Sequence, residues 1–131
     1  MKQLAGVAVS LAVLTACGGS SPDATAHFVS TVKAAYATAE AQENHGSRSA
    51  TAWETFAITV QNTPAGKDAV QRGLLVAAAR HASDAYTAMV RDSRCRTDRY
   101  LNGGAACPAN DAGDPSRWEQ RVAQLVDGLR A

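Results

Sequence analysis

The sequence has no excess of charge of either sign. Its 131 residues contain 13 Lys and Arg against 12 Asp and Glu, which gives a formal net charge of +1. A chain this close to neutral generates no overall field that would attract nucleic acid. The composition therefore predicts no nucleic-acid partner.

The motifs that usually identify an enzyme are also missing. No Gly-x-Ser-x-Gly nucleophile elbow occurs, and Gly103-Gly104 is followed by alanines rather than by the lysine of a phosphate-binding loop. The acids Asp111 and Asp114 do not have the alternating spacing of a calcium loop. The sequence thus predicts no catalytic residue, no cofactor and no metal site, and it favours a protein that is not an enzyme.

The N-terminal apolar run is too short to span a bilayer. Leu4 to Ala16 contains 13 residues, whereas a spanning helix needs roughly 20. The run follows a start with one basic residue, Lys2, and closes on small residues. A basic start, a short apolar middle and small residues before a cleavage point are typical of a secretory signal peptide.

The last four residues of this segment, Leu14-Thr15-Ala16-Cys17, resemble the lipobox of bacterial lipoproteins. The resemblance implies cleavage before Cys17 and a diacylglycerol group on the Cys17 sulfur. Because stable membrane anchoring takes two acyl chains or two signals, such a group would hold the protein at the membrane. We therefore expect a signal peptide over 1–16, a lipidated cysteine and flexible tether over 17–21, and a single helical domain over 22–131.

The three cysteines divide into one lipid site and one pair. With Cys17 taken by lipid, Cys95 and Cys107 remain, and two cysteines outside the cytoplasm most simply form a disulfide. Metal binding is the weaker alternative, because zinc takes four ligands and no Cys-x-x-Cys spacing occurs. We expect a disulfide that closes a loop.

Apolar residues at helical spacing predict four helices. They are expected from Pro22 to about Glu43, from a capping box at Thr51 and Glu54 to about Asn62, from about Pro64 to Asp92, and from Asp114 onward. The third carries the widest apolar arc, and Gly73 is expected to mark a close helix crossing. Residues 93–113 show no helical pattern, so the fold class is an all-α, small four-helix bundle with a disulfide-closed loop before the last helix.

His81 falls on the apolar arc of the third helix. The ordinary interpretation is a buried histidine that bonds a carbonyl or a hydroxyl, such as that of Tyr36 or Tyr86. The alternative is a polar point in a pocket between helices that recognises a ligand or a metal ion.

Four arginines form the densest basic cluster, Arg91, Arg94, Arg96 and Arg99, diluted by two aspartates. One interpretation is a solvated helix end whose basic residues favourably meet the helix dipole. The other is a docking patch, centred on Arg94, Arg96 and Arg99, for an acidic partner, lipid headgroups or a cell-wall polymer.

The sequence favours a membrane-anchored lipoprotein on the extracytoplasmic face of the cell membrane, acting as a non-catalytic binding or interaction module. Its expected partners are the membrane, through the lipid on Cys17, and an envelope protein. The alternatives are a small-ligand carrier with a pocket near His81 and an envelope enzyme of unseen type.

Overall fold

The computed structural model describes residues 22–42 and 47–130. The signal peptide, the lipidated Cys17, the tether and the turn expected at Asn44-His45-Gly46 lie outside the described residues. The described chain forms four α-helices and one short 3-10 turn, with no strand. The bounds of these elements are α2 Pro22–Glu40, α3 Ser47–Gln61, η1 Gly66–Asp68, α4 Ala69–Asn102 and α5 Pro115–Asp127.

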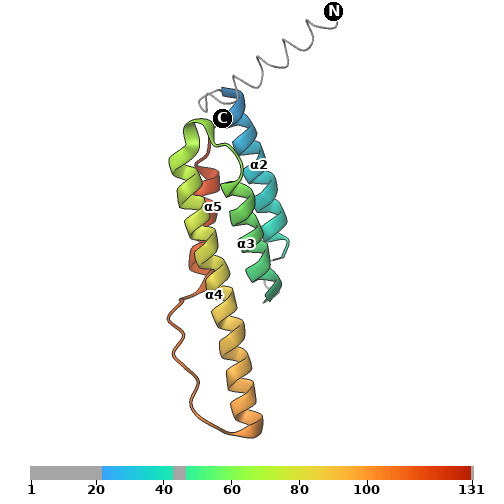
Figure 1. The fold of residues 1–131 in the computed structure, drawn as a ribbon, viewed down its shortest axis with the longest axis vertical. Coiled ribbons are helices and arrows are strands. Elements are labelled where there is room, and N and C mark those ends of the chain that lie inside the picture. Colours follow the sequence, from blue (N-terminus) through green and yellow to red (C-terminus); the bar gives the residue numbers. More distant parts are fainter. Residues whose placement is uncertain (1–21, 43–46, 131) are drawn as a thin grey trace, which may run out of the picture.

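Successive helices run in opposite directions (Figure 1). The beginning of α2 and the end of α5 therefore lie at one end of the molecule, and the far end of α4 lies at the other. Helix α3 packs against both α2 and α4, and α5 packs mainly against α4. The prediction of an all-α, four-helix bundle is confirmed.

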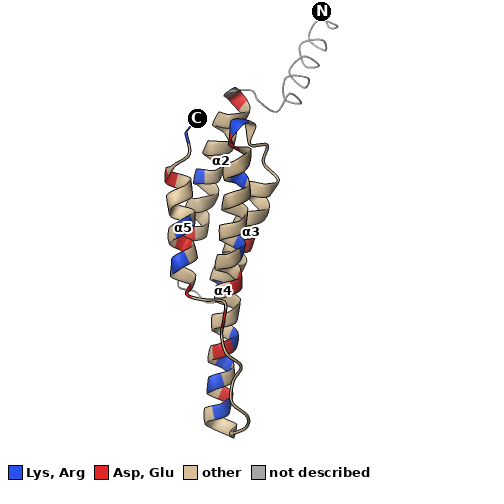
Figure 2. Cartoon of the chain, turned by 90° about the vertical axis from the view of Figure 1, so that its left-hand side faces the viewer, with Lys and Arg blue, Asp and Glu red and all other residues tan. Residues whose placement is uncertain are grey.

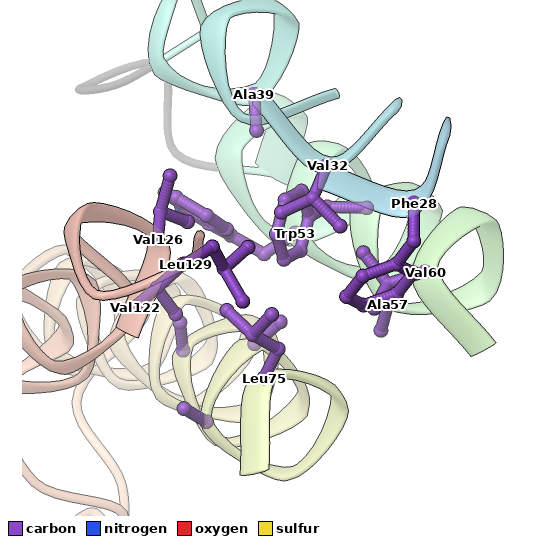
Figure 3. Close-up of a cluster of buried hydrophobic side chains, with 14 of the residues drawn as sticks. Phe28, Val32, Ala39, Trp53, Ala57, Val60, Leu75, Val122, Val126 and Leu129 are labelled. Atoms are coloured by element: carbon purple, nitrogen blue, oxygen red, sulfur yellow. The ribbon is translucent and has the colours of Figure 1, made fainter. Parts of the chain in front are cut away.

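The core lies where the four helices face one another. Side chains from α2, α3, α4 and α5 point toward a common centre in Figure 3. Trp53 is fully buried there, and its ring meets that of Phe56 edge to face at 5.6 Å. The largest fully buried side chains are those of Trp53, Phe28, Phe56, Leu75, Leu129, Val32, Val60 and Val122.

Two buried hydrogen bonds tie α4 to its neighbours. The Tyr86 hydroxyl donates to Glu119 Oε1 on α5 at 2.6 Å, and the Ser83 hydroxyl donates to the Ala50 carbonyl on α3 at 2.8 Å. Pairing of this kind compensates for the hydration that a polar group loses when it is buried. The two bonds fix how α4 is rotated about its own axis relative to α3 and α5.

The ends of two helices differ from the predictions. Helix α3 begins at Ser47, so Thr51 lies inside the helix and the capping box expected at Thr51 and Glu54 is wrong. Helix α4 continues to Asn102 instead of ending near Asp92. The start of α5 is as expected, since Asp114 caps it by accepting a hydrogen bond from the Ser116 amide at 3.0 Å.

The apolar arc of α4 is narrower than expected. Val70 and Leu74 are 71% and 43% exposed, and a Cβ added to Gly73 would meet no atom within 4 Å. The close helix crossing expected at Gly73 is therefore wrong. Single apolar residues such as Val70 and Leu74 are tolerated on a solvated face, so apolar spacing alone overestimates the width of the buried stripe.

Candidate functional site: an arm beyond the bundle

The second half of α4 leaves the bundle. We name the segment formed by residues 89–102 of α4 and the return segment 103–114 the braced arm. Ala88 is the last buried side chain of α4, and no side chain is buried again until Pro115. The braced arm therefore has no apolar core, and it projects past the other helices (Figure 1).

The disulfide predicted between Cys95 and Cys107 is confirmed and lies in this arm. Their Cα atoms are 5.9 Å apart, and the bridge links the return segment to the side of α4. A cleft of about 480 Å³ lies beside the bridge, and its lining includes Arg91, Asp92 and Asp111. In the chain-entropy model, a crosslink that closes a loop of this size contributes roughly 3 kcal/mol.

The arginines predicted to form a docking patch all lie on the arm and are exposed. Arg96 Nε pairs with Asp92 Oδ2 at 3.0 Å, and Asp98 accepts a hydrogen bond from the Asn102 amide at 2.8 Å. The guanidinium groups of Arg94 and Arg99 have no hydrogen-bond or ion-pair partner among the described residues. Figure 2 shows basic and acidic residues interspersed along the projecting part of α4.

The helix separates these arginines onto different faces. At about 100° per residue, Arg94 and Arg96 lie on either side of the face opposite Cys95. Arg99 lies one turn beyond Cys95, on the side of the disulfide and in the last turn, where its charge favourably meets the helix dipole. The arm therefore places Arg94 and Arg96 at the two edges of one surface and Arg99 elsewhere.

Two large apolar side chains share that surface. Tyr100 and Leu101 are 89% and 70% exposed. At about 100° per residue, Tyr100 lies beside Arg96 on the helix surface, and Leu101 lies beside Arg94. We name this surface, formed by Arg94, Arg96, Thr97, Tyr100 and Leu101, the outer face of the arm. Sequence reasoning missed Tyr100 and Leu101 because it assigned them to a loop, although two such residues in a polar segment were an available signal.

His81 lies away from the arm and on the surface. Its ring is exposed and stacks on that of Trp118, with centroids 4.3 Å apart and an interplanar angle of 19°. The expectation of a buried histidine bonded to Tyr36 or Tyr86 is wrong. Those hydroxyls donate instead to Glu40 and Glu119.

A groove between α2 and α3 has a volume of about 830 Å³. Small residues dominate its lining, and His81 is not among them. Arg48 is the one charged residue among the described residues that line it. The lining consists of Ser30, Thr31, Ala34, Ala35, Thr38, Ala39, Gln42, Arg48, Thr51, Ala52, Thr55, Phe56 and Thr59.

No group of three or more His, Cys, Asp or Glu side chains within residues 22–42 and 47–130 is placed to hold a metal ion. Among the helices that the structure describes, none combines the length and the apolar character needed to cross a membrane.

Comparisons with protein-family models, curated proteins and solved structures found no match. The residues of this chain alone therefore support its functional interpretation.

Proposed function

We propose that the protein is a lipoprotein anchored at the extracytoplasmic face of the cell membrane and that it acts as a non-catalytic interaction module. The observation that carries the proposal is the lipobox-like Leu14-Thr15-Ala16-Cys17 at the end of a short apolar run. The four residues from Gly18 to Ser21 can span at most roughly 15 Å when extended. A lipid on Cys17 would therefore keep the start of α2 close to the membrane surface.

The direction of the bundle supports the interaction role. Helix α2 begins at the end of the molecule opposite the braced arm (Figure 1). Helix α4 has 34 residues and is therefore about 50 Å long. A bundle held at the start of α2 can thus extend the arm away from the lipid, which favours an envelope protein over lipid headgroups as the arm's partner.

The anchor is tested by Cys17→Ala. We expect the variant to lose labelled fatty acid and to leave the membrane fraction, because it lacks the thiol to which the proposed lipid is attached. Cys107→Ser is the matched control, since it removes a cysteine of the arm and leaves Cys17 in place. A Cys17→Ala protein that is still labelled and still fractionates with membranes would refute the proposal.

A second candidate function is a carrier of a small, elongated and uncharged ligand. It is favoured by the groove between α2 and α3, whose volume is in the range of ligand sites and whose described lining residues are uncharged except for Arg48. The Thr38 hydroxyl there donates to the Ala34 carbonyl at 3.1 Å and is thus satisfied within its own helix. Described lining residues that carry a single charge suit an uncharged ligand better than an ionic one.

The carrier is tested by native mass spectrometry of the full chain purified from cells that export it. A ligand should copurify with the native chain and with Ala37→Trp, because Ala37 is exposed on α2 but outside the groove. It should be absent from Ala34→Trp, because the indole fills the groove. If no ligand copurifies, or if both variants retain it equally, the carrier function is wrong.

A further inference from the structure

We infer that the outer face of the arm binds an acidic protein surface that contains an apolar groove, with the end of α4 lying in that groove. The inference rests on the proposed function, because it names the partner of the interaction module. It is carried by the exposed apolar side chains, the charge and the bracing of this one face.

The exposed apolar side chains have no role in the fold. Tyr100 and Leu101 lie in the last turns of α4, beyond the last buried residue of that helix, and expose most of their surface. Neither packs against the core. Tyrosine and arginine are enriched among the residues that dominate binding energy at protein interfaces, and the outer face holds both types together.

The charge of the outer face is of one sign. Arg94 and Arg96 border it, and the two nearby acids lie on the flanks that face the disulfide side of the helix. Each of those acids is already engaged, Asp92 by Arg96 and Asp98 by Asn102. Since Arg96 is engaged by Asp92, Arg94 is the arginine of this face that has no partner among the described residues. Because a guanidinium binds a carboxylate through two parallel hydrogen bonds, Arg94 complements an acidic side chain.

The disulfide holds this face in its binding form. Cys95 is on the opposite side of the helix, so the bridge braces the arm without covering Arg94, Thr97 or Leu101. Ordering a helix during binding costs conformational entropy, and a helix that is already formed avoids that cost. Arg94, Thr97 and Leu101 follow one another at i, i+3 and i+7, so they lie on one face of the helix, as the contacts of a helix bound in a groove do.

An anionic polymer fits the outer face less well than a protein does. Phosphate or carboxylate groups along a polymer would pair with arginines on any side of the arm, including Arg99 on the disulfide side. They would give Tyr100 and Leu101 no apolar contact. A protein groove uses both the charge and the apolar surface, so it accounts for the whole outer face.

The test is photo-crosslinking in intact cells from a photoreactive residue placed at Thr97, in the centre of the outer face. We expect an adduct with a protein whose crosslinked peptide is acidic. Placed at the exposed Asp84 of the bundle, the same residue should give no such adduct. All variants are exposed substitutions, and circular dichroism should show unchanged helix content.

Substitutions within the crosslinked chain determine which groups carry the contact. Arg94→Gln, and separately Tyr100→Ala, should each reduce the adduct about tenfold, as the loss of an interface anchor does. The matched control Arg99→Gln, which removes the same charge on the disulfide side, should leave the adduct unchanged. The inference is overturned if Arg99→Gln weakens the adduct as much as Arg94→Gln does, if Tyr100→Ala has no effect, or if the captured species is a polymer.

Membrane fractionation of the same cells separates this inference from the proposed function. A chain that is lipid-labelled and membrane-bound but gives no adduct from position 97 refutes the inference and leaves the anchor standing. A chain that is neither labelled nor membrane-bound refutes the proposed function, whatever it crosslinks to.

Discussion

Helix α4 passes through two regions that are stabilised in different ways. Between Leu75 and Ala88 it buries eight side chains against α3 and α5. From Met89 to Asn102 it buries none, yet it remains helical. The first region depends on apolar packing, and the second depends on continuity with a helix that is already formed.

The braced arm shows what keeps a helix ordered without a core. Starting a helix is unfavourable, whereas extending one adds a hydrogen bond for each residue fixed, so the bundle supplies the start that the arm needs. The Asp92–Arg96 pair contributes at i, i+4, and the Asp98–Asn102 hydrogen bond has the same spacing. The disulfide then restrains the return segment, which has no regular structure of its own.

The largest difference between the two regions should appear when an aromatic residue is removed from each. Trp53→Ala should lower the free energy of unfolding by about 3–5 kcal/mol, because it leaves a cavity in the core. Tyr100→Ala should change it by less than about 0.5 kcal/mol, because Tyr100 is almost fully exposed. Urea unfolding of both variants measures this, and similar losses would contradict the division between bundle and arm.

Removal of the disulfide should affect the arm more than the bundle. The double variant Cys95→Ser with Cys107→Ser should lose up to about 3 kcal/mol of unfolding free energy. Hydrogen exchange should quicken most in residues 95–102, where no core remains to hold the helix. If protection is lost equally in α3 and in the arm, the disulfide is part of the global fold and not a local brace.

The buried bond between Tyr86 and Glu119 lies near the boundary between the two regions. Tyr86→Phe should cost about 1–3 kcal/mol, since the variant removes a donor from a buried carboxylate. Tyr36→Phe is the matched control, because the Tyr36 hydroxyl bonds Glu40 at an exposed position of α2. In thermal unfolding, the midpoint temperature of Tyr86→Phe should be well below that of Tyr36→Phe. The reverse order would show that the buried bond does not stabilise the fold.

The smallest expected effect is a gain in stability from Gly73→Ala. Glycine inside a helix costs about 1 kcal/mol relative to alanine, and nothing surrounds the position that a Cβ would take. Gly66→Ala should instead destabilise the fold, because Gly66 has φ +56° and its added Cβ would collide with Thr25. A loss of stability in Gly73→Ala would mean that another helix approaches this position after all.

The same contrast explains what the sequence could predict. The helices of the bundle were predicted because Phe28, Val32, Trp53 and Val122 face a core and therefore recur at helical spacing. The extension of α4 to Asn102 was not predicted, because a helix that packs against no core has no apolar residues at helical spacing. The disulfide followed from the number of cysteines and needed no knowledge of the arm.

Some residues of the candidate sites were predicted from the sequence and others were not, for a related reason. Arg94 and Arg96 were found as a charge cluster, but their separation from Arg99 became visible only with the helical geometry of the arm. His81 was misplaced because Leu74 and Ala77, which widened the apparent apolar stripe of α4 beside it, are exposed. The groove between α2 and α3 depends on how two helices meet, which no single helix reveals.

The antiparallel order of the helices also has a mechanical consequence. The start of α2 and the tip of the arm lie at opposite ends of the molecule (Figure 1). Tension between these two points would pull α2 and α4 in opposite directions along their axes. The force would be transmitted between α2 and α4 by their side-chain contacts with α3. Those contacts would be loaded in shear, and all of them would oppose the force at the same time.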